Sequence, residues 1–366
     1  MSGSTYGTIF KITTWGESHG AGIGVVVDGC PAGLELSEDD IQVFLNRRKP
    51  GQNRYATPRK ESDTVEILSG IFEGRTTGTP ISLLVRNTSQ RSGDYGEIAN
   101  YYRPGHADYT FDAKYSFRDY RGGGRSSGRE TIGRVAAGAI ASKVLATLGI
   151  SLITYTRSIG PVSIETFDEA QIPLNPLNMP DAAAAEKASE YLDNCLKEHN
   201  SSGGLVECII HGCPAGVGDP VFEKLDANLA KALMSIGAVK GVEIGDGMSV
   251  AQATGLTDND GFSIDAKGQI TKLSNHAGGI LGGISDGSDI CLRAAFKPTP
   301  SIFANQKTIT RTGENIDIQI KGRHDPIIAP RAVVVVESMA AITLLDSLMT
   351  GMSSKLSNLQ TIWSQN

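Results

Sequence analysis

The chain has 366 residues, a formal net charge of −6, and 40% hydrophobic against 20% charged residues. This composition is typical of a globular protein with room for one large domain or two ordinary ones. The acidic balance argues against general nucleic-acid binding, no apolar run approaches the length of a membrane span, and the first residues lack signal-peptide features, so we expect a cytoplasmic protein.

Short strands and helices are expected along the whole chain. β-Branched residues between turn signals predict strands at 8–13, 23–27, 65–71, 81–85, 205–210 and 289–295. Apolar periodicity and cap residues predict helices at 38–47, 132–147, 181–198, 221–235 and 334–350, with Ser37 as the cap of the first. No clean linker separates these elements into domains.

One short motif occurs twice. Residues 29–33 and 212–216 both read Gly-Cys-Pro-Ala-Gly, and each copy follows an apolar strand and leads toward a helix. The copies lie half a chain length apart, which favours an internal duplication, although a five-residue match can also arise by chance. We therefore predict one domain over residues 1–366, made of two related halves of about 1–180 and 181–366.

The five cysteines are scattered and are expected to be free, buried thiols. Cys208, His211 and Cys213 form the one cluster that could suggest a metal. A metal site needs a fourth ligand and tighter spacing than this cluster has. We predict no metal.

Arginine is concentrated in two segments, 47–60 and 118–134. The most informative run is Arg-Gly-Gly-Gly-Arg-Ser-Ser-Gly-Arg-Glu-Thr at 121–131, directly before the predicted helix 132–147. Glycines let backbone N–H groups approach a ligand, guanidinium groups bind phosphate or carboxylate in pairs, and a helix N-terminus favours anions. The run predicts an anion site, and the alternative is a solvated basic surface.

Three other segments carry residues suited to chemistry. His19 and His106 lie in Gly- and Pro-rich turns, where an imidazole can act as acid or base. Residues 297–301, Lys-Pro-Thr-Pro-Ser, could be a rigid phosphate or cofactor clamp or a plain turn. Asp325 follows Lys-Gly-Arg-His at 321–324 and could cap a helix, pair with an arginine or serve in catalysis.

Two common nucleotide-binding patterns are missing from the sequence. There is no Gly-x-x-x-x-Gly-Lys-Ser/Thr phosphate loop, and the Gly20-x-Gly22-x-Gly24 run precedes a strand rather than following one. The chain is therefore neither a recognisable nucleoside triphosphatase nor an ordinary dehydrogenase.

Four blocks, taken together, resemble a known family. Gly-Glu-Ser-His-Gly at 16–20, Arg-Pro-Gly-His-Ala-Asp at 103–108, Gly-Arg-Ser-Ser-Gly-Arg-Glu-Thr at 124–131 and Arg-His-Asp-Pro…Pro-Arg-Ala at 323–332 are similar to the signature blocks of chorismate synthases. The resemblance covers essentially the whole chain. It implies an α+β fold, a β-α-β sandwich with internal pseudo-twofold duplication, and a carbon–oxygen lyase of aromatic amino acid biosynthesis, the shikimate pathway.

The reaction implied by the resemblance is a 1,4-anti elimination of phosphate from 5-enolpyruvylshikimate 3-phosphate, giving chorismate. It requires reduced FMN but has no net redox change, and NADPH would serve only indirectly as a source of reductant. The family also implies a homotetramer. Because no reductase domain is visible, we expect an external flavin reductase. The substrate is a small molecule, and neither a nucleic acid nor a membrane is an expected partner.

The resemblance also implies residue roles. His106 would help phosphate leave, His19 would protonate or orient the reduced flavin, and Asp325 would support proton removal at the flavin. Substrate anions would be held by Arg48, Arg54, Arg129, Arg134 and Arg331, with Arg47 and Arg103 as weaker candidates. The flavin would be held by Arg125, Ser126, Ser127, Gly237, Ala238, Gly282, Lys297, Pro298, Thr299, Pro300, Ser301 and Arg323. Gly237 departs from the Pro or Asn that the family usually has there.

Two other classes of function remain open. A flavin-dependent oxidoreductase would consume its reductant stoichiometrically. A module that binds phosphorylated metabolites would bind without turnover and would have no use for His19 and His106.

Overall fold

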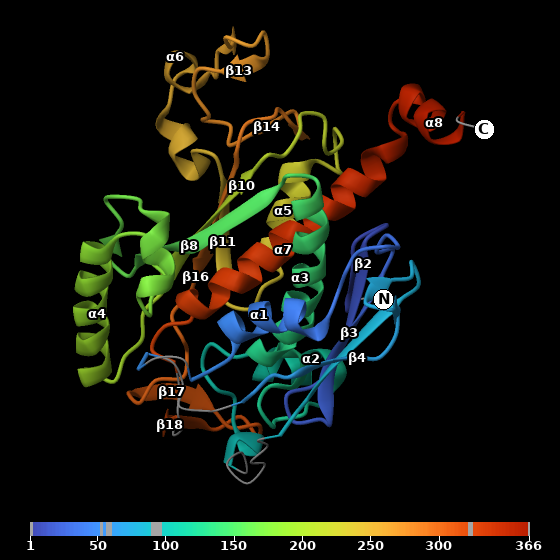
Figure 1. Cartoon of the computed structure of the whole chain (residues 1–366). Coiled ribbons are helices and arrows are strands. Elements are labelled where there is room, and N and C mark those ends of the chain that lie inside the picture. The colour runs from blue at the N-terminus through green and yellow to red at the C-terminus, as the bar shows by residue number, and fades with distance from the viewer. Residues whose placement is uncertain (1–2, 52–53, 56–60, 89–96, 321–324, 365–366) are drawn as a thin grey trace.

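Two five-stranded antiparallel sheets lie on either side of a layer of helices in the computed structural model (Figure 1), which describes residues 3–51, 54–55, 61–88, 97–320 and 325–364. The first sheet has the order β1(Thr5–Tyr6), β2(Lys11–Gly16), β3(Gly22–Asp28), β7(Ile81–Arg86), β4(Val65–Ile67). The second has the order β9(Val162–Ser163), β8(Ser151–Ile159), β10(Gly204–His211), β16(Ile290–Phe296), β11(Val239–Ile244). The expected α+β sandwich is confirmed.

The two sheets follow the same path. In each, two neighbouring strands are followed by Gly-Cys-Pro-Ala-Gly and then by a helix. The chain next forms an edge strand, and the strand after that lies between the edge strand and the strand that precedes Gly-Cys-Pro-Ala-Gly. A long helix follows that last strand in both cases. The equivalent pairs are β3 with β10, β4 with β11, and β7 with β16. This correspondence supports the duplication that the repeated motif indicates.

Four helices make up the layer between the sheets. These are α1(Glu38–Arg48), α3(Thr131–Thr147), α5(Leu225–Met234) and α7(Ala329–Thr350). Helices α1 and α3 pack against the first sheet, α5 and α7 pack against the second, and α3 contacts α7 directly. The predicted cap at Ser37 is present as a capping box with Asp40, which satisfies backbone donors at the start of α1.

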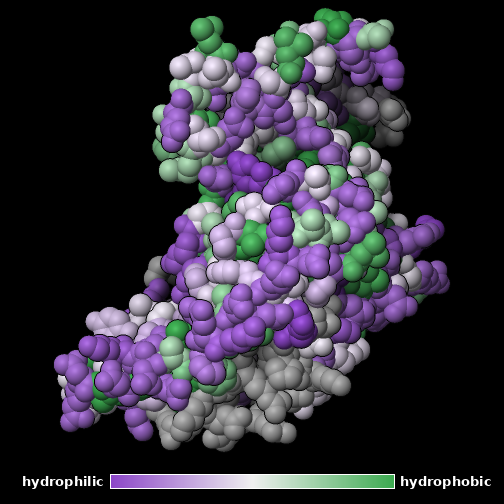
Figure 2. Space-filling view, turned by 90° about the vertical axis from the view of Figure 1, so that its left-hand side faces the viewer, coloured by the Kyte–Doolittle hydropathy of each residue, from purple (hydrophilic) through white to green (hydrophobic). Residues whose placement is uncertain are grey.

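The remaining elements lie around this core. They are β5(Ile71–Phe72), β6(Arg75–Thr76), α2(Asp108–Tyr115), α4(Ala182–Lys197), α6(Gly255–Asp258), β12(Phe262–Ile264), β13(Ile270–Lys272), β14(Ile280–Leu281), β15(Ile284–Ser285), β17(Asn305–Ile309), β18(Asn315–Gln319) and α8(Leu356–Trp363). Seen from the side of α4, the surface is mostly hydrophilic, with small groups of hydrophobic side chains at mid height and at the upper end, the level of α6 and β13 (Figure 2).

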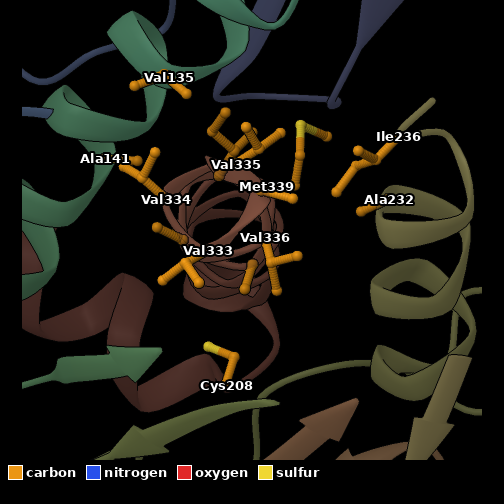
Figure 3. Close-up of a cluster of buried hydrophobic side chains, with 14 of the residues drawn as sticks. Val135, Ala141, Cys208, Ala232, Ile236, Val333, Val334, Val335, Val336 and Met339 are labelled. Carbon is orange, nitrogen blue, oxygen red and sulfur yellow. The ribbon is translucent and has the colours of Figure 1, made fainter. Parts of the chain in front are cut away.

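Helix α7 is the centre of the hydrophobic core. Its residues Val333 to Val336 point outward in all directions, toward α3, α5 and Cys208 of β10 (Figure 3), and Val336 is 0% exposed. The helix with the turn after it, 329–353, is long and apolar enough to cross a membrane, which the sequence reading did not anticipate. Because 83% of its most apolar window is buried inside the protein, α7 here is a core helix.

Some element boundaries differ from those expected. The predicted helix 221–235 begins only at Leu225, since Val221 has a φ of +67°, and the predicted helix 334–350 begins earlier, at Ala329. Strands β8 and β11 were not predicted. Both pair within the second sheet, so their conformation is supported by long-range hydrogen bonds that a local pattern does not show.

Helices α3 and α7 are closely packed at Gly138. A Cβ added to Gly138 would lie 2.2 Å from Cβ of Ser338, so Gly138→Ala must push the two helices apart. We expect this change to lower the free energy of unfolding by about 1–3 kcal/mol, as overpacking does. Urea unfolding measures it, with Gly255→Ala as the control, because the nearest atom to that added Cβ is 3.7 Å away. Equal stability of the two variants would contradict this packing.

Candidate active site

Two of the predicted motifs meet at His106. Nε2 of His106 lies 3.0 Å from Oγ of Ser301, and Nζ of Lys297 donates to the carbonyl oxygen of Gly105 at 2.7 Å. Gly105 has a φ of +70°, and an added Cβ there would lie 2.7 Å from Cβ of Pro300. The 103–108 loop therefore needs its glycine to pack against the 297–301 loop.

His106 is uncharged at neutral pH. Burial lowers its pKa to about 4, and the positive charges of Arg103 and Lys297 act in the same direction, against the carbonyl of Pro104 and the carboxylate of Asp108. An imidazole in this state can accept a proton or a hydrogen bond at one nitrogen. To act as an acid it must first gain a proton.

Arg103 holds the shape of the 103–108 loop. Its Nε and Nη2 donate to the two carboxylate oxygens of Asp108 at 2.8 and 2.9 Å, and its backbone N–H donates to the same group at 3.0 Å. Nη1 of Arg118 lies 3.2 Å from this carboxylate. Burial would raise the pKa of Asp108, but Arg103 holds it below its ordinary value. Arg103 is thus paired inside its own loop.

His19 lies against the glycine run of the 121–131 loop. Gly122 has a φ of +64°, and a Cβ added to it would lie 2.3 Å from Cε1 of His19. Oγ of Ser18 lies 3.1 Å from Nδ1 of His19 and donates to the carbonyl of Gly122 at 3.3 Å. Arg121 of the same loop pairs with Asp119 at 2.8 Å.

Glu130 joins two of the predicted anion-binding arginines. It accepts from Nε of Arg134 at 2.8 Å and lies 3.5 Å from Nη2 of Arg125, while Thr14 donates to it at 2.8 Å. Arg134 also donates to Oγ of Ser235 at 2.7 Å. Ser235 is two residues before Gly237, so the start of α3 lies near the predicted segment with Gly237 and Ala238.

Asp63 joins two further arginines. Its carboxylate is fully buried, 2.8 Å from Nη1 of Arg48 and 3.2 Å from Nη1 of Arg129. Burial raises the pKa of Asp63 and lowers that of Arg48 to about 10, so Arg48 stays charged at neutral pH. Arg129 also pairs with Glu61 and donates to Oδ1 of Asn87 at 2.9 Å.

Asp325 and Arg331 form a pair at the start of α7. Nη1 of Arg331 lies 2.5 Å from Oδ2 of Asp325, and its Nε donates to the carbonyl of Arg48 at 3.3 Å. The N-terminus of α7 therefore reaches the arginine cluster at the end of α1. Arg47, a weaker candidate, pairs instead with Glu337 of α7 at 2.5 Å.

These contacts connect the predicted motifs. Asn87 donates to the carbonyl oxygens of Glu17 and Gly20 and accepts from Arg129, which links the His19 turn to the arginines. The backbone N–H of Lys297 donates to the carbonyl of Ala238 at 2.9 Å, which links the 297–301 loop to the segment after α5. Segments from residue 16 to residue 331 thus lie in one continuous network.

The 297–301 loop and the 121–131 loop fit a cofactor. Oγ1 of Thr299 is buried and has no hydrogen-bond partner among the described residues, although Pro298 and Pro300 fix the loop around it. Ser126 donates to the carbonyl of Gly123 at 2.7 Å, and Ser127 accepts from the N–H of Arg129 at 3.4 Å. Gly128 is exposed, and a Cβ added to it would meet nothing within 4 Å, so this part of the backbone is accessible to a ligand.

Three predicted site residues lie elsewhere or outside the described residues. Arg54 is 64% exposed and pairs with Asp193 of α4 at 2.9 Å. Gly282 lies in the turn between β14 and β15, at the opposite end of β16 from Lys297. Arg323 lies outside the described residues. Among the described residues, the side-chain partners of Arg54 are Tyr55 and Asp193, which lie outside the contacts around His106.

Sequence reasoning missed the acidic half of this site. Asp63, Asp108 and Glu130 each pair with one or more arginines. Asp63 has a φ of +47°, which a local pattern does not reveal. Glu130 and Asp108 lie inside the motifs named above. The sequence spacing that could have revealed their pairing is four residues from Glu130 to Arg134 and five residues from Arg103 to Asp108.

The cluster of Cys208, His211 and Cys213 does not form a metal site in the described residues. Cys208 is fully buried, whereas His211 pairs with Asp289, and the described residues contain no group of three metal-ligating side chains.

Comparison with known proteins identifies the family. A family model described as chorismate synthase matches residues 10–349. The chain is 69% identical over 358 residues to a chorismate synthase of Agathobacter rectalis, covering 97% of both chains, and 66% identical over 365 residues to one of Lachnoclostridium phytofermentans, covering 99% of this chain and all of the relative. A solved structure, "Crystal Structure of Chorismate Synthase", matches with a TM-score of 0.77 at 30% identity, covering 98% of this chain and 97% of that one. The chain belongs to the chorismate synthase family.

Proposed function

We propose that the network around His106 is the active site at which this chain converts 5-enolpyruvylshikimate 3-phosphate to chorismate. The reaction is a 1,4-anti elimination, in which a ring C–H bond and the allylic C–O bond to phosphate both break. The observation that carries the assignment is that contacts connect segments distant in sequence. Segment 103–108 contacts 297–301, which is connected to 325–331 through Ser201 and Ser202. Arg48 connects 325–331 to 121–131, and Asn87 connects 121–131 to 16–20.

The substrate anions are assigned to Arg48, Arg129, Arg134 and Arg331. A phosphate and two carboxylates need several bidentate cations, and guanidinium groups supply them. Each of these arginines is held by a carboxylate, which fixes its position before substrate arrives. Arg54 remains a prediction of the family resemblance, since its observed partner is Asp193.

The proton-handling groups are His106, His19 and Asp325. His106 is assigned to the leaving phosphate, whose negative charge favours the protonated imidazole. His19 is assigned to the cofactor side, where it lies against Gly122. Asp325 is assigned to support of ring-proton removal, and its pairing with Arg331 keeps its carboxylate beside the substrate arginines.

Reduced FMN is the proposed cofactor. When bound, it supplies electron density to the allylic system and is not consumed. The chain would hold it with Arg125, Ser126, Ser127, Gly237, Ala238 and residues Lys297, Pro298, Thr299, Pro300 and Ser301, while Gly282 and Arg323 remain predictions from the family. We also propose that NADPH serves only indirectly, through an external flavin reductase, and that the enzyme is cytoplasmic.

We propose a homotetrameric assembly. The part of the chain with β12 and β13 projects from the body (Figure 1) and exposes Phe262, Ile264 and Ile270, each by more than 60%. Helix α8 also projects, and Trp363 on it is 75% exposed. Apolar side chains gathered on projecting elements favour contacts between subunits.

We further propose that the chain is one domain of two related halves. The sequence predicts a division near residue 180. The repeated strand order favours a first half that ends with α3 and a second that begins with β8, so we propose a division at residues 148–150 instead. The excursion with α4 then belongs to the second half.

An anaerobic assay tests the proposed function. Protein, photoreduced FMN and substrate are mixed without oxygen, and phosphate release, chorismate absorbance and flavin absorbance are followed together. We expect one phosphate per chorismate over many turnovers with no net flavin oxidation. Flavin oxidised in proportion to product would indicate an oxidoreductase, and binding without phosphate release would indicate a binding module.

A further inference from the structure

We propose that Asn87 is a positioning residue for the reaction. Its carboxamide holds the His19 turn, residues 16–20, and the guanidinium group of Arg129 in a fixed arrangement, and it does so without adding a negative charge beside Arg129. The double contact follows from the hydrogen bonds of Asn87, whereas its effect on turnover rests on the proposed function.

The first sheet determines where Asn87 lies. Asn87 directly follows β7, which ends at Arg86, and its backbone N–H donates to the carbonyl oxygen of Ala21 at 3.1 Å. This hydrogen bond continues the pairing of β7 with β3, in which Arg86 lies opposite Gly22. The half-buried side chain of Asn87 is therefore placed by the register of two central strands.

The partners of Asn87 fix the orientation of its carboxamide. Nδ2 lies 2.8 Å from the carbonyl oxygen of Glu17 and 2.9 Å from that of Gly20. A carbonyl can only accept, so Nδ2 donates both of its hydrogens to the His19 turn. Oδ1 lies 3.2 Å from Nε and 2.9 Å from Nη2 of Arg129, and a guanidinium group can only donate. Both ends of one amide group are thus used, each toward a different segment.

An amide suits this place better than a carboxylate of the same shape. Arg129 already pairs with the carboxylates of Glu61 and Asp63, and its side chain is only 12% exposed. A third carboxylate would weaken the attraction of Arg129 for a substrate anion, and an ionised carboxylate cannot donate to the carbonyls of the turn. The neutral Oδ1 of Asn87 orients the guanidinium group and leaves its positive charge for the substrate.

Loss of the carboxamide should affect the His19 turn more than Arg129. Two further hydrogen bonds hold the turn: the N–H of Gly20 donates within it at 3.1 Å, and Ser18 donates to a neighbouring loop at 3.3 Å. Both are longer than the two bonds from Nδ2 of Asn87. Arg129, in contrast, keeps its two carboxylate partners.

The first test needs neither cofactor nor substrate. Hydrogen–deuterium exchange of the full chain compares the wild type with Asn87→Ala and Asn87→Asp, which both lack the donors to the turn. We expect exchange in segment 16–20 to become about fivefold faster in both variants, with α3 unchanged. Asn358→Ala is the control, because it removes an amide that donates to the carbonyl of Met352 near α8. Unchanged exchange in 16–20, or an equal acceleration throughout the first sheet, would overturn the proposal.

The second test separates charge from packing. Calorimetry measures the affinity of 5-enolpyruvylshikimate 3-phosphate for the protein with oxidised FMN. We expect Asn87→Asp to weaken binding about tenfold and Asn87→Ala only about threefold, because the carboxylate competes with the substrate for Arg129. A packing role predicts the reverse order, since aspartate has nearly the shape of asparagine. Equal or reversed effects would contradict the role of the neutral amide.

The third test asks whether Asn87 acts through His19. Single-turnover rate constants with photoreduced FMN, which do not depend on the fraction of active protein, are measured for a double-mutant cycle. Asn87→Ala should lower the rate constant about tenfold in the wild type but less than about twofold in the His19→Ala background. The same factor in both backgrounds would overturn the proposal. A wild type that forms no chorismate would instead refute the proposed function, while the exchange experiment would still decide whether Asn87 holds the turn.

Discussion

Replacing His106 with alanine is expected to lower turnover by ~10²-fold or more, because general acid–base groups contribute about this much to a rate. FMN binding should be retained, since the backbone and side chains of the 121–131 loop are untouched. The measurement is kcat from phosphate release under anaerobic conditions with photoreduced FMN, together with a flavin titration.

The matched control is His211→Ala. His211 pairs with Asp289 at 2.9 Å, at the end of β10 that is remote from Ser301. This variant should keep both turnover and flavin binding. A His106→Ala enzyme with the turnover of His211→Ala would remove His106 from the mechanism.

The second large effect is on stability. Arg48→Met should lower the free energy of unfolding by ~3–5 kcal/mol, as expected when one partner of a buried ion pair is removed. Side chains of Arg48 and Asp63 are 3% and 0% exposed, so the change removes the nearer cation from a buried carboxylate and leaves Arg129 at 3.2 Å. Urea unfolding followed by circular dichroism gives the difference.

Arg54→Met provides the comparison, because it removes the same kind of side chain from a surface pair. Arg54 is 64% exposed in its pair with Asp193, and exposed pairs contribute ~0–1 kcal/mol. The two variants should therefore separate clearly in their urea midpoints. Equal midpoints would mean that the Arg48–Asp63 pair does not stabilise the fold as its burial implies.

The sequence allowed much of this site to be predicted. Each of these motifs combines glycines with charged or hydroxyl side chains. A loop that serves only as a connection does not need this combination, so the motifs indicate a functional site. The structure brings His106 to Ser301, His19 to Gly122, and Arg331 to Arg48. The repeated Gly-Cys-Pro-Ala-Gly motif likewise predicted two related halves, because a turn between a strand and a helix is a local property.

What could not be predicted depends on contacts between distant segments. Asp63 is paired with Arg129, 66 residues away, and Arg54 with Asp193, 139 residues away. Two arginines of the basic segment 47–60 therefore have different environments: Arg48 is buried against Asp63, and Arg54 is exposed and contacts Asp193 of α4. The sequence pattern predicts the same role for Arg48 and Arg54. Their different environments depend on the path of the chain after α1, which the local pattern does not predict.

Hydrogen–deuterium exchange of the full chain with oxidised FMN, with and without substrate, tests the convergence of these loops most directly. The account predicts that substrate slows exchange together in segments 16–20, 103–108, 121–131, 297–301 and 325–331, and leaves α4 unchanged. Protection confined to a single one of these segments, or protection of α4 instead, would contradict a shared active site.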